Sequence, residues 1–237
     1  MNLKRLLLGS FNLQAMSTQL LASSSSAPHA ATNTFPCVVV FGRPGAGKTT
    51  VADTAVAKVE KEQLCCCLGL DLDVCVPEWM RENFAKGIYP TLKQRQDFAT
   101  ICCDYVEQRV DEKRGNNEHV NPAVIVSFSF VNTDLRDIFR SRFPRAKWVL
   151  LDTSETEATK RINMREDHFY KGEKAGGTEQ DKDEPDNNSA DSSDADNSEW
   201  KFAPVTFDHV VVDGTQPIET NADRVVKTLI EAIRSLE

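Results

Sequence analysis

Near the start of the chain, three glycines precede a lysine and a threonine in the spacing of a phosphate-binding loop. The glycines let backbone N–H groups turn toward phosphate oxygens where a Cβ would clash. The helix predicted to begin at Lys48 points the positive end of its dipole at the same anion. Lys48 can reach the β- and γ-phosphates of a nucleoside triphosphate, and the Thr49 hydroxyl can bind Mg²⁺. The alternative, a chance glycine-rich turn, leaves the strand before and the helix after it unexplained. The predicted nucleotide-binding residues are Gly42, Pro44, Gly45, Ala46, Gly47, Lys48, Thr49 and Thr50.

Two aspartates, Asp71 and Asp73, stand at the end of a second short apolar run. Ligands of parallel sheets bind at the carboxyl ends of the strands, so both acids are expected near the phosphate loop. If the chain stays extended, alternation places the two side chains on the same side. One carboxylate could then hold Mg²⁺, and the other could accept the proton of an attacking hydroxyl. The alternative is a pair of solvated acids in a turn.

Arg95 lies just inside a long predicted helix. Its planar fork could bind an anionic or polyhydroxylated substrate, because that shape matches a carboxylate. The alternative is a surface arginine on an amphipathic helix. Ser127 and Ser129 end the third predicted strand without an acid, which favours a small-molecule kinase whose metal ligand comes from the aspartate pair. A GTPase is disfavoured because the sequence holds no Asn-Lys-x-Asp element.

Arg161, Arg165 and His168 are spaced i, i+4 and i+7, so a helix would carry them on one face. A cationic face beside a triphosphate would neutralise developing charge, and an arginine could also stack on a base. The alternative is an exposed charged helix in which Glu166 and Asp167 are the partners.

Strand-like and helix-like segments alternate along the chain. The predicted strands are 37–41, 67–70, 123–127, 147–151 and 208–212. The predicted helices are 48–63, 91–113, 133–142, 154–170 and 219–236. This order indicates an α/β fold, a parallel sheet covered by helices on both faces.

The two segments least suited to a packed core are 1–35 and 172–199. The first is basic, serine-rich and free of acids, which is typical either of an organellar transit peptide or of a disordered extension. The second holds ten acids and two lysines, a net charge of −8 that equals that of the whole chain. It is almost free of large apolar groups, so we expect a disordered insertion. One domain is therefore predicted over 36–237.

Composition narrows the class of protein further. A 40% hydrophobic share over 237 residues permits a real core, and no apolar run approaches the ~18 residues of a membrane-spanning helix. The body sums to zero charge and has no basic stripe, which argues against nucleic-acid binding. The seven cysteines follow neither a disulfide framework nor a zinc pattern. Reduced thiols favour an intracellular protein, cytoplasmic or, with a transit peptide, mitochondrial or plastid.

Beyond the phosphate loop, the chain resembles the gluconokinase group, close to shikimate kinases among P-loop kinases of the adenylate-kinase-like fold. The resemblance covers roughly residues 36–172 and 204–236. Asp71-Leu72-Asp73 followed by Pro77 is similar to that group's D-x-D-x-x-H-P segment. The spacing from Gly87 to Arg95 and the series Arg161, Arg165, His168, Phe169 match two more of its segments.

The resemblance implies an ATP- and Mg²⁺-dependent kinase, a monomer or homodimer, with a five-stranded parallel sheet and a mobile lid at about 161–171. It implies that Lys48, Asp71, Asp73 and Arg165 are catalytic, and that Asp71 and Thr49 serve the metal. Arg161, Thr215 and Pro217 would bind the adenosine side of ATP. The implied acceptor-side residues are Asp73, Arg95, Ser129 and His168.

Departures from the group's pattern lie on the acceptor side. Val76 replaces a histidine, Asn132 stands where a lysine is usual, and Thr91, Lys93 and Gln94 replace acids before Arg95. We therefore predict transfer of the γ-phosphate to a hydroxyl of a sugar acid or similar polar carboxylate, with gluconate as the first candidate. The alternatives are a nucleoside monophosphate kinase and a non-catalytic ATP-binding regulatory protein.

Overall fold

The computed structural model describes residues 35–115, 121–164 and 202–236. Nearly all of the predicted leader and the whole acidic segment 172–199 lie outside these ranges, as do Arg165 and His168. All seven cysteines lie inside them and are free thiols, as predicted, with four buried. In this part of the chain no helix combines the length and the hydropathy needed to cross a membrane.

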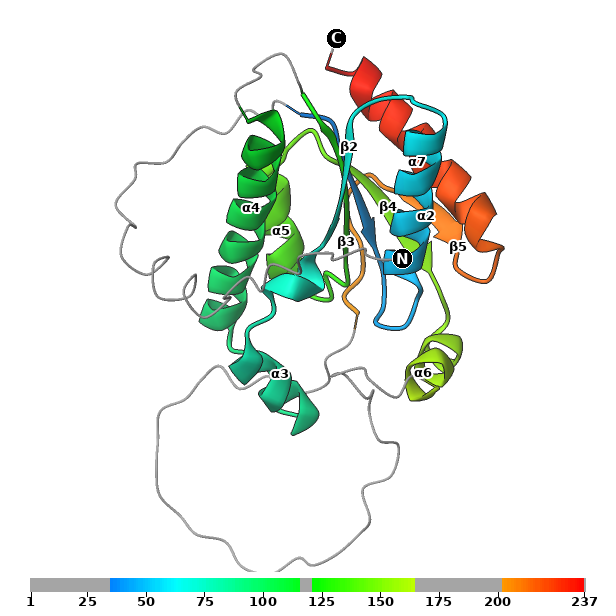
Figure 1. Ribbon diagram of the computed structural model, residues 1–237. Helices are drawn as coiled ribbons and strands as arrows, with labels where there is room; N and C mark the ends of the chain where they lie inside the picture. The colour runs from blue at the N-terminus through cyan, green and yellow to red at the C-terminus, as the bar shows by residue number, and fades with distance from the viewer. Residues whose placement is uncertain (1–34, 116–120, 165–201, 237) are drawn as a thin grey trace, which may run out of the picture. The chain divides into compact units, whose positions relative to one another are not determined.

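The described residues form a five-stranded, all-parallel sheet in the order β2-β3-β1-β4-β5 (Figure 1). The strands are β1 (Cys37–Phe41), β2 (Cys67–Asp71), β3 (Ala123–Phe128), β4 (Lys147–Asp152) and β5 (Val210–Asp213). β1 is central and completely buried because both of its faces are covered, which explains its uninterrupted apolar sequence.

Two apolar layers pack on opposite faces of the sheet, and alternation along β1 divides its side chains between them. Val38 and Val40 face α2 (Lys48–Lys61) and α7 (Ile218–Arg234). Val39 and Phe41 face the other core, built with α4 (Leu92–Arg114) and α5 (Thr133–Arg142). Figure 1 shows the two helix pairs on either side of the sheet. The predicted α/β sandwich is confirmed.

The five predicted strands and five predicted helices are present, with ends that differ by a few residues. α6 spans Glu155–Asn163, and the rest of the predicted helix 154–170 beyond Met164 lies outside the described residues. Two elements were not predicted: a 3₁₀ turn at Leu72–Cys75 and α3 (Glu78–Ala85). Both elements are short, and each has a single buried side chain, Leu72 or Met80. One apolar position does not make the repeating hydrophobic pattern by which a helix is recognised in a sequence.

A buried arginine anchors the segment that leads into β5. Arg136 is 1% exposed, and its guanidinium donates to the carbonyls of Phe130, Val131, Ala203 and Pro204 at 2.7–3.2 Å. It also lies 4.5 Å from the ring centre of Phe202. Burial lowers its pKa to about 10, although the negative charge of Asp137 acts in the opposite direction. Arg136 therefore ties the 202–204 segment to the loop after β3.

Candidate active site

The phosphate loop joins β1 to α2, and two of its glycines adopt left-handed backbone conformations. Gly45 has a φ of +81°, and a Cβ there would stand 2.4 Å from the carbonyl oxygen of Ala158 on α6. Gly47 has a φ of +96° and caps the N-terminus of α2. A side chain at position 45 would therefore separate the loop from α6, which explains the glycine.

Lys48 begins α2 and is 9% exposed. Its Nζ donates to the carbonyl oxygen of Arg43, 2.9 Å away across the loop. The first turn of α2 contains no acid, so the positive end of the helix dipole is not neutralised there. The loop thus brings an ammonium group together with a helix N-terminus, two features that favour a polyphosphate anion.

Asp71 connects the phosphate loop to the end of β2. Its Oδ2 accepts a hydrogen bond from Thr49 Oγ1 at 2.9 Å, and its Oδ1 accepts from the backbone N–H of Asp73 at 2.9 Å. The condition that the chain stays extended through Asp73 is not met, because a 3₁₀ turn begins at Leu72, whose side chain is fully buried. Both acids nevertheless line one pocket with Lys48.

The paired oxygens of Thr49 and Asp71 suit Mg²⁺, which prefers hard oxygen ligands and keeps several waters. A third acid, Asp53, was missed by the sequence analysis. It lies one turn beyond Thr49 on α2, and partial burial together with the negative charge of Asp71 raises its pKa. The i, i+4 spacing from Thr49 was the available signal.

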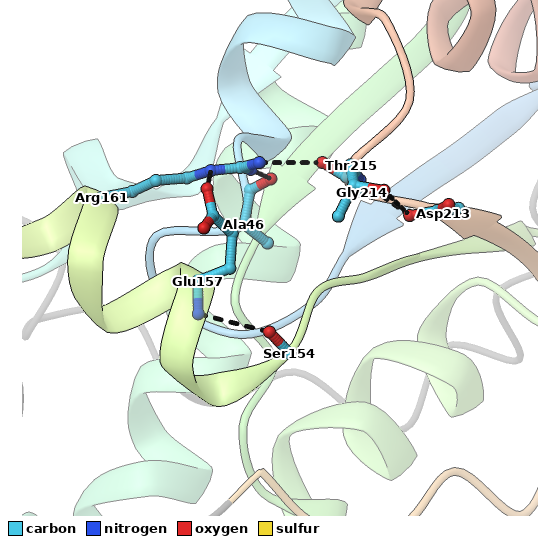
Figure 2. Close-up of polar contacts among 7 residues, drawn as sticks. All are labelled: Ala46, Ser154, Glu157, Arg161, Asp213, Gly214 and Thr215. Atoms are coloured by element: carbon cyan, nitrogen blue, oxygen red, sulfur yellow. Dashed lines mark hydrogen bonds and ion pairs between the residues drawn. The ribbon is translucent and has the colours of Figure 1, made fainter.

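Arg161 extends from α6 to the phosphate loop and to the end of β5 (Figure 2). Its Nη1 donates to the carbonyl of Ala46 and its Nη2 to that of Gly214, each at 3.2 Å. Nε pairs with Glu157 at 3.0 Å, and Ser154 Oγ accepts from the Glu157 N–H to cap the helix. Arg161 therefore bridges two loops that lie far apart in sequence.

The turn after β5 is held by the carboxylate of Asp213. Thr215 donates to Asp213 Oδ1 through its hydroxyl at 2.6 Å and its backbone N–H at 2.8 Å, and Gln216 donates to Oδ2. These hydrogen bonds, the Thr215 hydroxyl first, lower the pKa of Asp213. Pro217 caps α7 directly after this turn. Both predicted residues, Thr215 and Pro217, are thus beside the loop that Arg161 contacts.

Arg95, which also lines the pocket, is held by Asp134. Its Nε donates to Asp134 Oδ2 at 2.9 Å, and its Nη1 to the carbonyl of Pro90 at 3.0 Å. Thr91 and Gln94 form a reciprocal capping box at the start of α4, which gives two of the departures in the sequence a structural role. Asp134 was not predicted; its position in the first turn of α5 gave no sign that it would meet Arg95.

A single pocket brings most of the predicted residues together. It is lined by Pro44, Gly45, Gly47, Lys48, Thr49, Thr50, Asp71, Asp73, Arg95 and Ser129. Gly42 and Ala46 are not part of this lining: a Cβ at Gly42 would stand 2.6 Å from the carbonyl oxygen of Leu151, and Ala46 is buried. The sequence analysis did not identify the apolar part of the lining, which comprises Val76, Met80, Phe84, Pro90, Phe98, Phe128, Val131 and Leu135.

Three known structures with a similar fold carry the name of a kinase. A sugar kinase from Janibacter sp. HTCC2649 superimposes with a TM-score of 0.57 at 20% identity, covering 85% of this chain and 98% of its own. A gluconokinase from Sinorhizobium meliloti 1021 gives 0.54 at 20% identity, covering 85% and 96%. The APS kinase of Mycobacterium tuberculosis, solved with AMPPNP and APS, gives 0.53 at 15% identity, covering 83% and 99%.

No protein-family model and no curated protein matches the sequence. At these identities the structural likeness establishes the fold, which is that of P-loop kinases. It confirms the resemblance drawn from the sequence at the level of architecture, and the activity has to be argued from the site.

Proposed function

We propose that this protein is an ATP-dependent kinase that phosphorylates a hydroxyl group of a small molecule. The observation that carries the proposal is the meeting of Lys48, the Thr49–Asp71 pair and Asp73 in one pocket at the carboxyl ends of β1 and β2. These are the parts that phosphoryl transfer requires: a phosphate cradle, a metal position and a group that orients the nucleophile. The similar folds of a sugar kinase and a gluconokinase add support.

On the nucleotide side, the amides of the phosphate loop and the ammonium group of Lys48 bind the phosphates. Arg161 and the Asp213–Pro217 turn bind the adenosine part of ATP. Arg161 connects this turn to the phosphate loop through the carbonyls of Gly214 and Ala46. Thr49 and Asp71 would hold Mg²⁺, which when bound neutralises charge on the β- and γ-phosphates. The negative charge of Asp71 contributes to the raised pKa of Asp53, so the two carboxylates lie near one another, and we assign Asp53 to the water shell of the same ion.

On the acceptor side, Asp73 receives the hydroxyl proton. The hydroxyl oxygen forms a bond to the γ-phosphorus as the bond from that phosphorus to the β–γ bridging oxygen breaks, and ADP leaves with that electron pair. Lys48 stabilises the charge that develops on the transferred group. The products are ADP and a phosphate ester, and the proton passes from Asp73 to solvent.

The resemblance to gluconokinases makes gluconate the first acceptor to test, with other sugar acids beside it. Nucleoside monophosphates are the alternative acceptors. Arg81 and Arg95, the arginines best placed for an acceptor phosphate, already donate to the protein: Arg81 to the carbonyls of Asp73 and Val76, and Arg95 to Asp134. This engagement favours a hydroxyl acceptor over a phosphate acceptor.

The decisive experiment measures acceptor-dependent ADP release with sugar acids, other hydroxy acids, AMP, CMP and UMP. Lys48→Ala is expected to lower turnover at least about 100-fold because it removes a charged contact to the transferred phosphate. Lys61→Ala is the matched control, an exposed lysine at the far end of the same helix, and should retain wild-type turnover.

The contrary results are equally clear. If the protein binds MgATP by calorimetry but forms no phosphorylated product from any acceptor, the non-catalytic alternative is supported. If MgATP binding itself is absent, or is unchanged in Lys48→Ala, the assignment of the phosphate loop is wrong.

A further inference from the structure

The 3₁₀ turn that follows β2 carries Asp73 and is held by contacts on both sides. Asp71 Oδ1 accepts a hydrogen bond from the backbone N–H of Asp73 at 2.9 Å. From α3, Arg81 donates to the carbonyl of Asp73 and, at 3.0 Å, to that of Val76. The side chain of Leu72 is fully buried. Because the turn is short and fixed by these contacts, a displacement at its end reaches Asp73.

The last residue of this turn, Cys75, is one of four cysteines that gather beside α4. The other three are Cys37 on β1 and Cys102 and Cys103 on α4, and each of them is 0–1% exposed. Cys75 packs against the apolar core that contains these three and is itself partly exposed. Of the four, only Cys75 is therefore accessible to a reagent in solution.

The thiols of Cys75 and Cys102 are hydrogen-bonded to one another. Cys102 lies in the middle of α4, and α4 contacts the 3₁₀ turn. Burial raises the pKa of Cys102, and the hydrogen bond with Cys75 raises it further, so Cys102 keeps its proton and donates it to the sulfur of Cys75. The charge of Asp73 acts in the same direction, which places Asp73 near Cys102 as well.

A partly exposed thiol in contact with a buried one can be oxidised in two steps by a disulfide reagent. Cys75, as the thiolate, attacks one sulfur of the reagent, so that a mixed disulfide forms and one thiol leaves. Cys102 then gives up its proton and attacks the sulfur of Cys75, and the second thiol leaves. The two cysteines lose two protons and two electrons in all, which reduce the reagent to two thiols.

We propose that Cys75 and Cys102 form a reversible disulfide, with glutathione disulfide or a similar small disulfide as the oxidant, and that this bond slows phosphoryl transfer by displacing Asp73. A covalent bond brings the two sulfurs closer than a hydrogen bond does, so the end of the turn moves toward α4. A misplacement of about 1 Å in a catalytic site can lower the rate about 100-fold. The inference rests on the proposed kinase activity for its effect on turnover, whereas bond formation is independent of it.

Mass spectrometry tests whether the bond forms. Reduced protein is incubated with glutathione disulfide, the remaining thiols are blocked, and the protein is digested. We expect a cross-linked pair of peptides that contain Cys75 and Cys102. A cross-link between other cysteines, or modification confined to the exposed Cys66, would refute the inference.

Three variants separate the two steps of the oxidation. Cys75→Ser should form neither the glutathione adduct nor the cross-link, and it should fold because residue 75 is only partly buried. Cys102→Ser should stop at a glutathione adduct on Cys75. Cys66→Ser is the matched control, since this exposed cysteine lies outside the pair, and it should still form the cross-link. A lasting adduct on Cys75 in the wild-type protein would contradict the role of Cys102.

Steady-state kinetics test the effect on the site. The cross-linked protein should have a kcat at least about tenfold lower than the reduced protein, with KM for ATP within about twofold, and dithiothreitol should restore kcat. Cys75→Ser should keep the kcat of the reduced wild-type protein before and after treatment with glutathione disulfide. Full activity of the cross-linked protein, or an equal loss in Cys75→Ser, would show that the bond does not act on Asp73.

Failure of this inference is distinguishable from failure of the kinase assignment. If the reduced protein phosphorylates an acceptor and no cross-link forms, the kinase stands and the inference falls. If no acceptor is phosphorylated, amide hydrogen exchange replaces turnover: the peptide that spans the 3₁₀ turn should exchange more slowly in the cross-linked protein, with no such change in treated Cys75→Ser. Unchanged exchange in the cross-linked protein would overturn the inference.

Discussion

The two sides of the pocket are built in different ways. The proposed nucleotide side is made mostly of backbone, because the phosphate loop, the N-terminus of α2 and the carbonyls that Arg161 contacts lie within short segments. The proposed acceptor side is made of side chains from separate segments, with Asp73 in the 3₁₀ turn, Arg95 on α4 and Ser129 after β3. A binding site made of backbone groups is maintained as long as a short local motif is present. A binding site made of side chains changes its chemistry whenever one of those residues is substituted. On the proposed assignment, this difference accounts for departures from the gluconokinase pattern that lie on the acceptor side.

The largest expected effect is on kcat and distinguishes the proposed acceptor side of the pocket from the nucleotide side. Asp73→Asn removes the proton acceptor and should lower kcat about 100-fold or more, while KM for ATP stays within about twofold. Steady-state kinetics at saturating acceptor measure both values. Asp137→Asn, an exposed acid on α5, is the control. A rise in KM for ATP comparable with the fall in kcat would place Asp73 on the nucleotide side instead.

A second prediction tests the backbone character of the phosphate loop. Gly45→Ala should lower the free energy of unfolding by about 3 kcal/mol, because the new Cβ meets Ala158 of α6 and the left-handed φ disfavours a side chain. Gly87→Ala is a matched control, with a φ of +73° and open space around the new Cβ. It should cost about 1 kcal/mol.

Urea unfolding of both variants measures this comparison. Similar losses of stability would mean that contact between the loop and α6 contributes little, so that backbone conformation alone explains the glycine. A stable Gly45→Ala protein with full ATP affinity would remove the argument for a tight loop.

The metal position provides a smaller effect. Asp71→Asn weakens one of the two proposed protein ligands, so the Mg²⁺ concentration for half-maximal activity should rise about tenfold. Turnover measured over a range of Mg²⁺ concentrations at fixed ATP gives this value, and chelation of Mg²⁺ should abolish turnover in both proteins. An unchanged Mg²⁺ requirement would mean that Asp71 serves only to orient Thr49 and the turn at Asp73.

The smallest expected effect concerns the adenosine end. Arg161→Ala removes the bridge between Ala46 and Gly214 and should raise KM for ATP about fivefold with little change in kcat. Lys160→Ala, its exposed neighbour on α6, is the control. If Arg161→Ala lowers kcat but leaves KM unchanged, the side chain acts on the transferred phosphate rather than on the nucleoside.

Much of the fold could be predicted from the sequence because its signals are local. Five apolar runs gave the five strands, and the spacing of Gly42, Gly47, Lys48 and Thr49 identified the loop, since a turn of bare amides leaves few choices of residue. The 3₁₀ turn at Leu72–Cys75 was missed because the burial of Leu72, a contact at a distance in sequence, bends the chain there.

The amino-acid sequence by itself determined the parallel sheet with helices on both faces, the phosphate loop and the presence of an acid pair. Each of these can be recognised from residues that are close together in the chain. Only the tertiary structure decided that Asp134 holds Arg95 across 39 positions, that Arg161 reaches from α6 to Ala46 and Gly214, and that rings from α3, α4 and β3 line one pocket. The physical reason is that these contacts depend on how whole elements pack against one another, which no local pattern of residues encodes.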